Sequence, residues 1–457
     1  MADKAVSLRG EQTVLFTNRQ LVALMWPLLL EQFLAITVGL ADSLMVATVG
    51  DAAISAVSLV DSISNLMIYI FSAMATGGAA VAGQYIGQRQ KEDACHAGQQ
   101  LIALLAAVSV FFVALLYLFR TQILTVMFGH IEPDVMAATN TYYLYVMASI
   151  PGIALYNGGA ALWRTMGRSD ISLKVSLLMN GINVAGNAIL IFGFGMDVAG
   201  VAIPTLVSRA VAAAVILGML FNDKLTLHLS NVRAFRLDMR LMKNIFYIGV
   251  PSGVENGMFQ LGRLVLFSLI STFGTASMVA NAIGNTIANF NCFAGQAINL
   301  GLAAVVSQCV GAGEFDQARA YMKKIVKWIC GIMAVVNLTI IALLPLIMRV
   351  YNVSPEAEKL AVTVSLIHGI SSIFLWIPAF TIPSFLRAAG DAQFTMLASM
   401  TTMWLVRVLL AYVLGRYLGY GVVGVWFAHA ILDWLVRGSV FILRYRSGKW
   451  ESMGIKT

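Results

Sequence analysis

Residues 21–49 read LVALMWPLLLEQFLAITVGLADSLMVATV, an apolar run that contains two acidic residues and no lysine or arginine. About 20 consecutive apolar residues suffice to cross the hydrocarbon core of a bilayer as an α-helix. The run is therefore long enough to span a membrane, and it is much longer than the strands of a membrane barrel. Within lipid its backbone groups find hydrogen-bond partners only if the segment is helical.

The composition of the whole chain agrees with this first segment. Of its 457 residues, 59% are hydrophobic and 11% are charged, whereas soluble domains carry roughly 25% charged residues. So few polar residues cannot cover the surface of a water-soluble fold. The composition excludes a soluble enzyme, a nucleic-acid-binding module and a disordered chain, and it predicts an all-α integral membrane protein surrounded by lipid.

The apolar runs repeat along the chain and predict twelve transmembrane helices. They lie at residues 20–48, 52–77, 97–119, 137–162, 172–195, 199–221, 245–271, 276–310, 325–349, 360–386, 394–415 and 422–443.

Lysine and arginine predict how these helices face the two sides of the membrane. If the N-terminus is cytoplasmic, the cytoplasmic segments hold 22 of the 30 basic residues, the opposite segments hold four, and four lie within spans. Loops rich in lysine and arginine stay on the cytoplasmic side. We therefore expect both termini in the cytoplasm and the protein in the cytoplasmic (inner) membrane.

The second half of the chain repeats the first at an offset of 223–224 residues. AAVAGQYIG at 79–87 aligns with AAVVSQCVG at 303–311, with five of nine positions identical, and Pro27 and Glu31 align with Pro251 and Glu255. Each half holds six spans, an even number, so the halves are predicted to be related by a pseudo-twofold axis along the membrane normal. Such lobes bind substrate between them and alternate its access to the two sides; repeats that stack only for stability are the other interpretation.

This organisation divides the chain into five predicted parts. They are a cytoplasmic N-terminal segment at 1–19, an N-lobe at 20–221, a cytoplasmic linker at 222–244, a C-lobe at 245–443 and a cytoplasmic tail at 444–457.

Acidic residues inside spans are costly in a membrane, on the order of 2.5–3.5 kcal/mol each, and therefore point to a function. Glu31 and Asp42 are eleven residues apart and share one face of the first span. The repeat keeps the glutamate as Glu255 but has Leu266 where Asp42 stands, so Asp42 belongs to the N-lobe alone. A buried carboxyl group can exchange a proton near neutral pH. Pairing of Asp42 with an arginine is the structural alternative.

Amides in the fifth span are candidates to complete a cation site with Asp42. Asn180, Asn183 and Asn187 lie on one side of the predicted helix, where their oxygens could face Asp42. Hydrogen bonding between helices is the alternative role for these amides.

Other polar residues within spans are predicted to line a central substrate cavity. They are Glu31, Asp61, Asn65, Glu255, Arg263, Asn285 and Asn289, with Arg407 a weaker candidate for the cavity wall. A solvated helix end is the alternative for Asp61. Asp433 and Arg437, four residues apart, are predicted to form a structural pair, and His368 and His429 to serve packing or hydrogen bonding because they lack metal-ligand companions.

The motifs that would indicate an enzyme do not occur in the sequence. We find no GxxxxGK[ST] phosphate loop, no HExxH, no GxSxG and no zinc-type Cys/His cluster. The sequence thus predicts neither an ATPase nor another enzyme, no cofactor and no certain metal site. The 23 methionines and 46 aromatic residues are typical of an adaptable pocket for apolar cations. Together these features favour a secondary transporter.

Several motifs resemble the multidrug and toxic compound extrusion (MATE) family, within the multidrug/oligosaccharidyl-lipid/polysaccharide exporter superfamily. They are LADSLMVA at 40–47, the paired AAVAGQYIGQ and AAVVSQCVGAG, RTMGRSD at 164–170, RAAGDAQ at 387–393 and NVAGNAILIFG at 183–193. The resemblance extends from about residue 13 to 445. It implies a V-shaped monomer of twelve helices that exports organic, mostly cationic compounds in exchange for H+ or Na+ by alternating access.

The resemblance also implies roles for single residues. The family's first-span aspartate matches Asp42, and Thr205 in the sixth span matches a hydroxyl beside the cation site. The family has an aspartate where this chain has Asn187, and the loss of that carboxylate favours H+ over Na+. A flippase for a lipid-linked saccharide or another amphiphile is the alternative function; it predicts a more cationic cavity, for which Arg263 and Arg407 are the candidates.

Overall fold

The computed structural model describes residues 14–129, 132–229 and 237–455. Parts of the predicted N-terminal segment, linker and C-terminal tail lie outside these ranges. Within them the chain is almost entirely helical and forms no strand. The prediction of an all-α fold is therefore confirmed.

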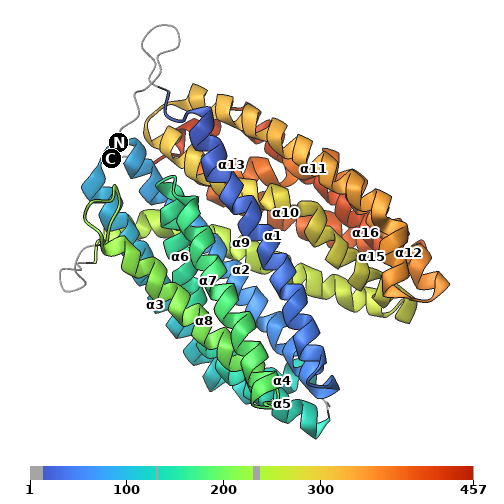
Figure 1. Cartoon of the computed structure of the whole chain (residues 1–457). Helices are drawn as coiled ribbons and strands as arrows, with labels where there is room; N and C mark the ends of the chain where they lie inside the picture. The colour runs from blue at the N-terminus through green and yellow to red at the C-terminus, as the bar shows by residue number, and fades with distance from the viewer. Residues whose placement is uncertain (1–13, 130–131, 230–236, 456–457) are drawn as a thin grey trace. The chain divides into compact units, whose positions relative to one another are not determined.

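The chain divides into two compact units, which we describe separately. The first unit holds Val22–Gly253, and the second holds the described residues up to Leu21 together with those from Val254 onward. In Figure 1 the first half of the chain runs from blue to green and the second from yellow to red.

The helices of the first half begin and end as follows: α1 (Asn18–Ala47), α2 (Asp51–Gly87), α3 (Lys91–Leu118), α4 (Arg120–Phe128), α5 (Pro133–Ala148), α6 (Ile150–Thr165), α7 (Ser169–Ala188), η1 (Ile189–Gly193), α8 (Ala199–Gly218) and η2 (Met219–Phe221). Here α2 packs against α3, α5 and α6, while α8 packs against α6 and α7.

The second half contains α9 (Met239–Ser271), α10 (Thr275–Gly311), α11 (Phe315–Tyr351), α12 (Pro355–Phe374), η4 (Ile377–Thr381), α13 (Ile382–Ala388), α14 (Ala392–Thr402), η5 (Met403–Val408), α15 (Leu409–Tyr412), η6 (Val413–Tyr417), α16 (Gly421–Phe427), η7 (Ala428–Asp433), α17 (Trp434–Arg446) and η8 (Lys449–Ser452). Here α10 packs against α11, α12 and α13.

The twelve predicted spans are all found as helical segments of the described chain. Ten of its helices are long and apolar enough to cross a membrane. The predicted fourth span is made of α5 and α6, which follow each other with a break at Ser149, and the seventh lies within α9, which carries four charged side chains. A break and a high charge lower the apolar signal of these two spans without preventing a crossing.

Two helices with an internal proline, α1 and α9, begin in one unit and continue in the other. The residues before α1 bind α11, since the Leu15 amide donates to Gln317 Oε1 at 3.0 Å. The start of α9 packs against α2, where a Cβ added at Gly77 would lie 3.1 Å from the Ile248 carbonyl oxygen. Only glycine permits this approach. The compact units therefore exchange the beginnings of α1 and α9 relative to the predicted lobes.

Five π-helical segments interrupt the α-helices of the described chain, four of them in the second half: η4, η5, η6 and η7. A π-turn inserts an extra residue and shifts the side chains that follow it around the helix. Two of these segments carry buried charges, Arg407 in η5 and Asp433 in η7. The π-turns thus place charged side chains inside the second unit.

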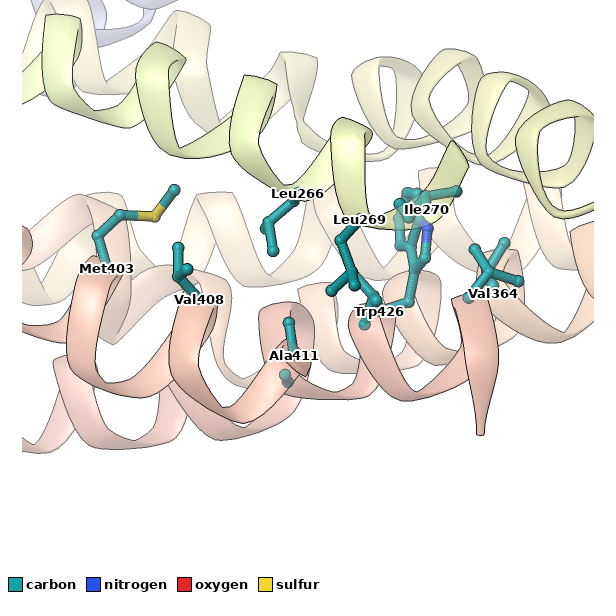
Figure 2. Packing of buried hydrophobic residues seen from close by; sticks show 11 residues of the cluster. Leu266, Leu269, Ile270, Val364, Met403, Val408, Ala411 and Trp426 are labelled. Atoms are coloured by element: carbon teal, nitrogen blue, oxygen red, sulfur yellow. The ribbon is translucent and has the colours of Figure 1, made fainter. Parts of the chain in front are cut away.

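An apolar cluster occupies the second unit at the position that repeats Asp42. Figure 2 shows Leu266, Leu269 and Ile270 from α9 packed against Met403, Val408, Ala411 and other buried side chains. Leu266 is 6% exposed. A carboxylate at this point would have no polar partner among the residues of the cluster.

Candidate functional site

The first unit brings Asp42 together with the amides of α7. Asn187 Nδ2 donates to Asp42 Oδ1 at 3.0 Å, and Asn187 Nδ2 lies 3.4 Å from Asn183 Oδ1. Asn183 and Asn187 are buried, and Asp42 is partly buried. The two amides lie four residues apart, one helical turn, so both face α1.

Asn183 also reaches Thr205 on α8. The Asn183 amide has the most partners when its nitrogen faces Asp42: the nitrogen then lies 3.0 Å from both carboxylate oxygens, and its oxygen accepts from Thr205 Oγ1 at 3.1 Å. Helices α1, α7 and α8 thus supply one group around Asp42. Asn180, three residues before Asn183, makes no hydrogen bond to this group in the described part of the chain.

The orientation of the amides differs from the expectation drawn from the sequence. We expected amide oxygens to face Asp42, but N–H groups do. An ionised carboxylate accepts several hydrogen bonds, and neutral N–H donors stabilise it without adding charge. The amides therefore satisfy Asp42 directly, and the Oδ1 atom of Asn187 is left buried without a partner.

A second carboxylate, Asp61 of α2, belongs to the same polar network. Tyr142 of α5 donates its hydroxyl to Asp61 Oδ1 at 3.3 Å. Arg209 of α8 attracts both Asp61 and Asp42, and the two carboxylates repel each other. Asp61 is partly buried and has a defined partner, which distinguishes it from a solvated helix end.

The two glutamates that follow the helix prolines are held by partners of their own half. Glu31 accepts from Tyr156 Oη at 3.1 Å and from Ser172 Oγ at 2.9 Å, and it is attracted to Arg164. Glu31 is 7% exposed. These contacts make it an internal polar residue that joins α1 to α6 and α7.

Glu255 repeats this arrangement in the second half. Both of its oxygens lie 3.1 Å from Arg387 Nη1, and Ser399 Oγ donates to Oε1 at 2.7 Å. Arg387 is the repeat of Arg164, so the two halves share a glutamate–arginine device. The signal that could have found these pairs was the joint recurrence of glutamate and arginine in one register.

The predicted structural pair of Asp433 and Arg437 is confirmed, with a third member. Arg437 Nη2 lies 3.0 Å and Arg407 Nη2 lies 2.8 Å from Asp433 Oδ2. Arg407 is 2% exposed, so it is an internal partner of Asp433 and forms no cavity wall within its unit. Both guanidinium groups also lie over the ring of Phe259.

The remaining predicted cavity residues lie at the edges of these networks. Arg263 is exposed, and its Nη2 lies 3.5 Å from Asn285 Oδ1. Asn65 and Asn289 are exposed. In their own units these side chains are accessible, in contrast to the two glutamates.

The two histidines fill the interior of the second unit, as predicted. His368 lies 3.1 Å from the Asn291 amide nitrogen through Nδ1, and its ring meets Trp426 and Trp434 edge to face. His429 contacts the same tryptophans. No group of three or more His, Cys, Asp or Glu residues suited to a metal ion occurs among the described residues.

Comparison with known proteins decides the family. The MatE family model matches the chain twice, over residues 27–189 and 251–413. The chain belongs to the MatE family. The two matches are offset by 224 residues, the same register as the repeat read from the sequence.

Relatives along the full length support this membership. The MatE chain is 28% identical over 442 residues to the uncharacterized transporter YisQ of Bacillus subtilis, covering 95% of each. It is 23% identical to the probable multidrug resistance protein NorM of Thermotoga maritima, covering 96% of this chain and 94% of that protein.

Solved structures show the same fold. The MATE transporter VcmN of Vibrio cholerae in the bent form superposes with a TM-score of 0.84 at 20% identity, covering 96% of this chain and 98% of that one. A superfamily transporter of Pyrococcus furiosus, described by the reverse polarity of its binding pocket, superposes with a TM-score of 0.87 at 18% identity, covering 96% and 97%. The predicted architecture of two six-helix halves is thereby confirmed, and the protein is a membrane transporter of this family.

Proposed function

We propose that this MatE transporter exports organic compounds in exchange for protons, by alternating access, and that Asp42 is the carboxyl group that binds and releases the proton. Its homologues are multidrug resistance proteins by name, which supports the transport of several unrelated compounds. The hydrogen-bonded group of Asp42, Asn183, Asn187 and Thr205 supports the place of coupling.

The observation that carries this proposal is the asymmetry between the two halves. Asp42 is partly buried among neutral amides, while its repeat Leu266 is buried in an apolar cluster. The acidic groups of the second half, Glu255 and Asp433, are each bound to arginine. Asp42 forms no salt bridge within 4 Å in the described chain, so protonation there need not break an ion pair.

Protons suit this site better than Na+. A hard cation needs several oxygen ligands, and a second carboxylate would strengthen its binding. Around Asp42, N–H groups occupy the positions where such oxygens would be needed, and Asn187 stands in place of a carboxylate. A proton needs only one oxygen of Asp42. Desolvation of the carboxylate keeps the neutral form accessible.

The proposed substrates are mostly cationic or amphiphilic drugs, bound by a monomer in the cytoplasmic membrane with both termini in the cytoplasm. The methionine and aromatic content supports an adaptable binding surface. The distribution of lysine and arginine supports the orientation.

A flippase for an amphiphile is the second candidate, and Arg263 favours it. This arginine is exposed on α9 and bound only weakly to Asn285, so it can attract an anionic headgroup. Arg407, the other cation considered from the sequence, is occupied by Asp433.

Transport in proteoliposomes tests the proposal. The purified chain is reconstituted, the membrane potential is clamped with K+ and valinomycin, and uptake of a fluorescent organic cation is driven by a pH gradient or a Na+ gradient in separate runs. We expect uptake with the pH gradient alone. Uptake that requires Na+ would refute proton coupling, and movement of a fluorescent lipid-linked saccharide without uptake of the cation would favour the flippase.

A further inference from the structure

Arg209 is a charged residue inside a span to which the sequence assigned no role. It lies on α8, one turn after Thr205, and is partly buried. Its Nη1 donates to Ser149 Oγ at 2.8 Å, where α5 ends and α6 begins. A Cβ added at Gly152 would lie 3.1 Å from the Arg209 carbonyl oxygen, so α6 and α8 approach closely here. The position of this arginine is therefore determined by the helix break.

The charged and titratable groups that face Arg209 come from three other helices. Asp42 comes from α1, Asp61 from α2 and Tyr142 from α5, and each interacts electrostatically with the guanidinium group. Tyr142 links to Asp61 by its hydroxyl at 3.3 Å. We call Asp42, Asp61 and Arg209 the charge triad. The amides of Asn183 and Asn187 complete its surroundings without adding charge.

The triad has a net charge of −1 when both carboxyl groups are ionised. One bound monovalent cation makes it neutral, and neutrality is strongly favoured inside a membrane. Without the arginine, two ionised carboxylates would carry −2 and would favour a second cation. The guanidinium group therefore acts as a cation that never leaves.

The partners divide the two carboxylates between two roles. Arg209 is the principal favourable partner of ionised Asp61, ahead of Tyr142, whereas for Asp42 the hydrogen bond from Asn187 comes first. The permanent positive charge is thus directed to Asp61. Asp42 is left as the group that exchanges the mobile cation.

The second half lacks this arrangement at the repeated positions. At an offset of 224 residues, Arg209 is replaced by Asp433, Asp42 by Leu266 and Asp61 by Asn285. Asp433 is already bound to two arginines. No net negative charge remains there for a mobile cation.

We propose that Arg209 is a positioning residue that limits the Asp42–Asp61 site to one exchangeable cation per transport cycle. The inference rests on the proposed function, because it concerns the stoichiometry of the same coupling site. It predicts that the number of protons exchanged follows the net charge of the triad. Variants that change or restore this charge can test it.

The test measures the number of protons exchanged per fluorescent organic cation, from the pH gradient that just balances an imposed substrate gradient in proteoliposomes. We expect one proton for the unmodified protein and for Arg209→Lys, and two for Arg209→Gln. Removing the positive charge should also shift the half-maximal pH of transport upward by about one unit, a tenfold gain in proton affinity. The double variant Arg209→Gln with Asp61→Asn restores the charge of −1 and should return both quantities to their original values.

Two further variants keep the test decisive. Asp61→Asn alone makes the triad neutral without a bound cation, so its transport should lose proton dependence; it tests the proposal even if Arg209→Gln does not fold, as judged by size-exclusion chromatography. Arg263→Gln removes an arginine of the other half and should change nothing. An unmodified protein that moves no protons would overturn the proposed function itself. Proton coupling in the unmodified protein, with the same stoichiometry and pH profile in both Asp61→Asn and any folded Arg209→Gln, would overturn the role of Arg209 alone.

Discussion

Replacing Asp42 by asparagine should uncouple transport from the pH gradient while leaving the fold intact. The side chain keeps its shape, but the amide cannot bind and release a proton. In the structure the carboxylate accepts N–H groups from Asn187 and Asn183 at 3.0 Å. The new amide retains one oxygen acceptor, so the loss in stability should be about 1–2 kcal/mol, which is small beside a change in function.

The size of the functional effect follows from the charge. One proton exchanged for one monovalent organic cation moves no net charge, so the membrane potential does not contribute. A pH gradient of one unit then supplies about 1.4 kcal/mol and supports about tenfold accumulation of the substrate. With Asp42→Asn this driving force vanishes, and the substrate should reach equal concentrations on the two sides.

The assay is accumulation of a fluorescent organic cation in proteoliposomes at a clamped potential and an imposed gradient of one pH unit. Asp51→Asn is the matched control, because it makes the same chemical change at an exposed carboxylate in the first turn of α2. The control should accumulate about tenfold, as the unmodified protein does. If Asp42→Asn, correctly inserted and at equal amount, also accumulates substrate about tenfold, then Asp42 does not couple the proton.

Three more outcomes are expected. Asn187→Asp adds a carboxylate beside Asp42 and should make transport respond to a Na+ gradient at constant pH and potential; an unchanged response would show that the missing carboxylate is not the reason for proton coupling. Glu255→Gln removes the partner of the Arg387 guanidinium and should lower the free energy of unfolding by roughly 1–3 kcal/mol, measured by thermal shift in detergent, with partial recovery when Arg387→Gln is added. In a background with the exposed Cys330 replaced by serine, Glu356→Cys should react with an impermeant thiol reagent added outside intact cells, and labelling only after permeabilisation would reverse the proposed orientation.

The partners of the buried charges are where the prediction from sequence was incomplete. The repeat register aligned Glu31 with Glu255 and Arg164 with Arg387, yet we assigned the two glutamates to a substrate cavity. The structure gives each glutamate partners within its own half, including Ser172 and Ser399. A charge on a span says that a partner is needed, whereas the identity of the partner depends on which helices are neighbours in space.

The amino-acid sequence by itself determined the membrane environment, the twelve spans, the twofold repeat and the single aspartate of the first half. These properties are local or periodic: the length of an apolar run and the register of a repeat can be counted along the chain. The family match at the same register, over 27–189 and 251–413, agrees with this count.

Only the tertiary structure decided which atoms meet. Asn187 and Asp42 are 145 residues apart, and the contact between a nitrogen of one and an oxygen of the other depends on how α7 packs against α1. Arg209 enters the same network because a helix break at Ser149 holds its side chain. A hydrogen bond depends on distances of a few tenths of an ångström and on the direction of donor and acceptor, and these are set by packing between helices far apart in the chain.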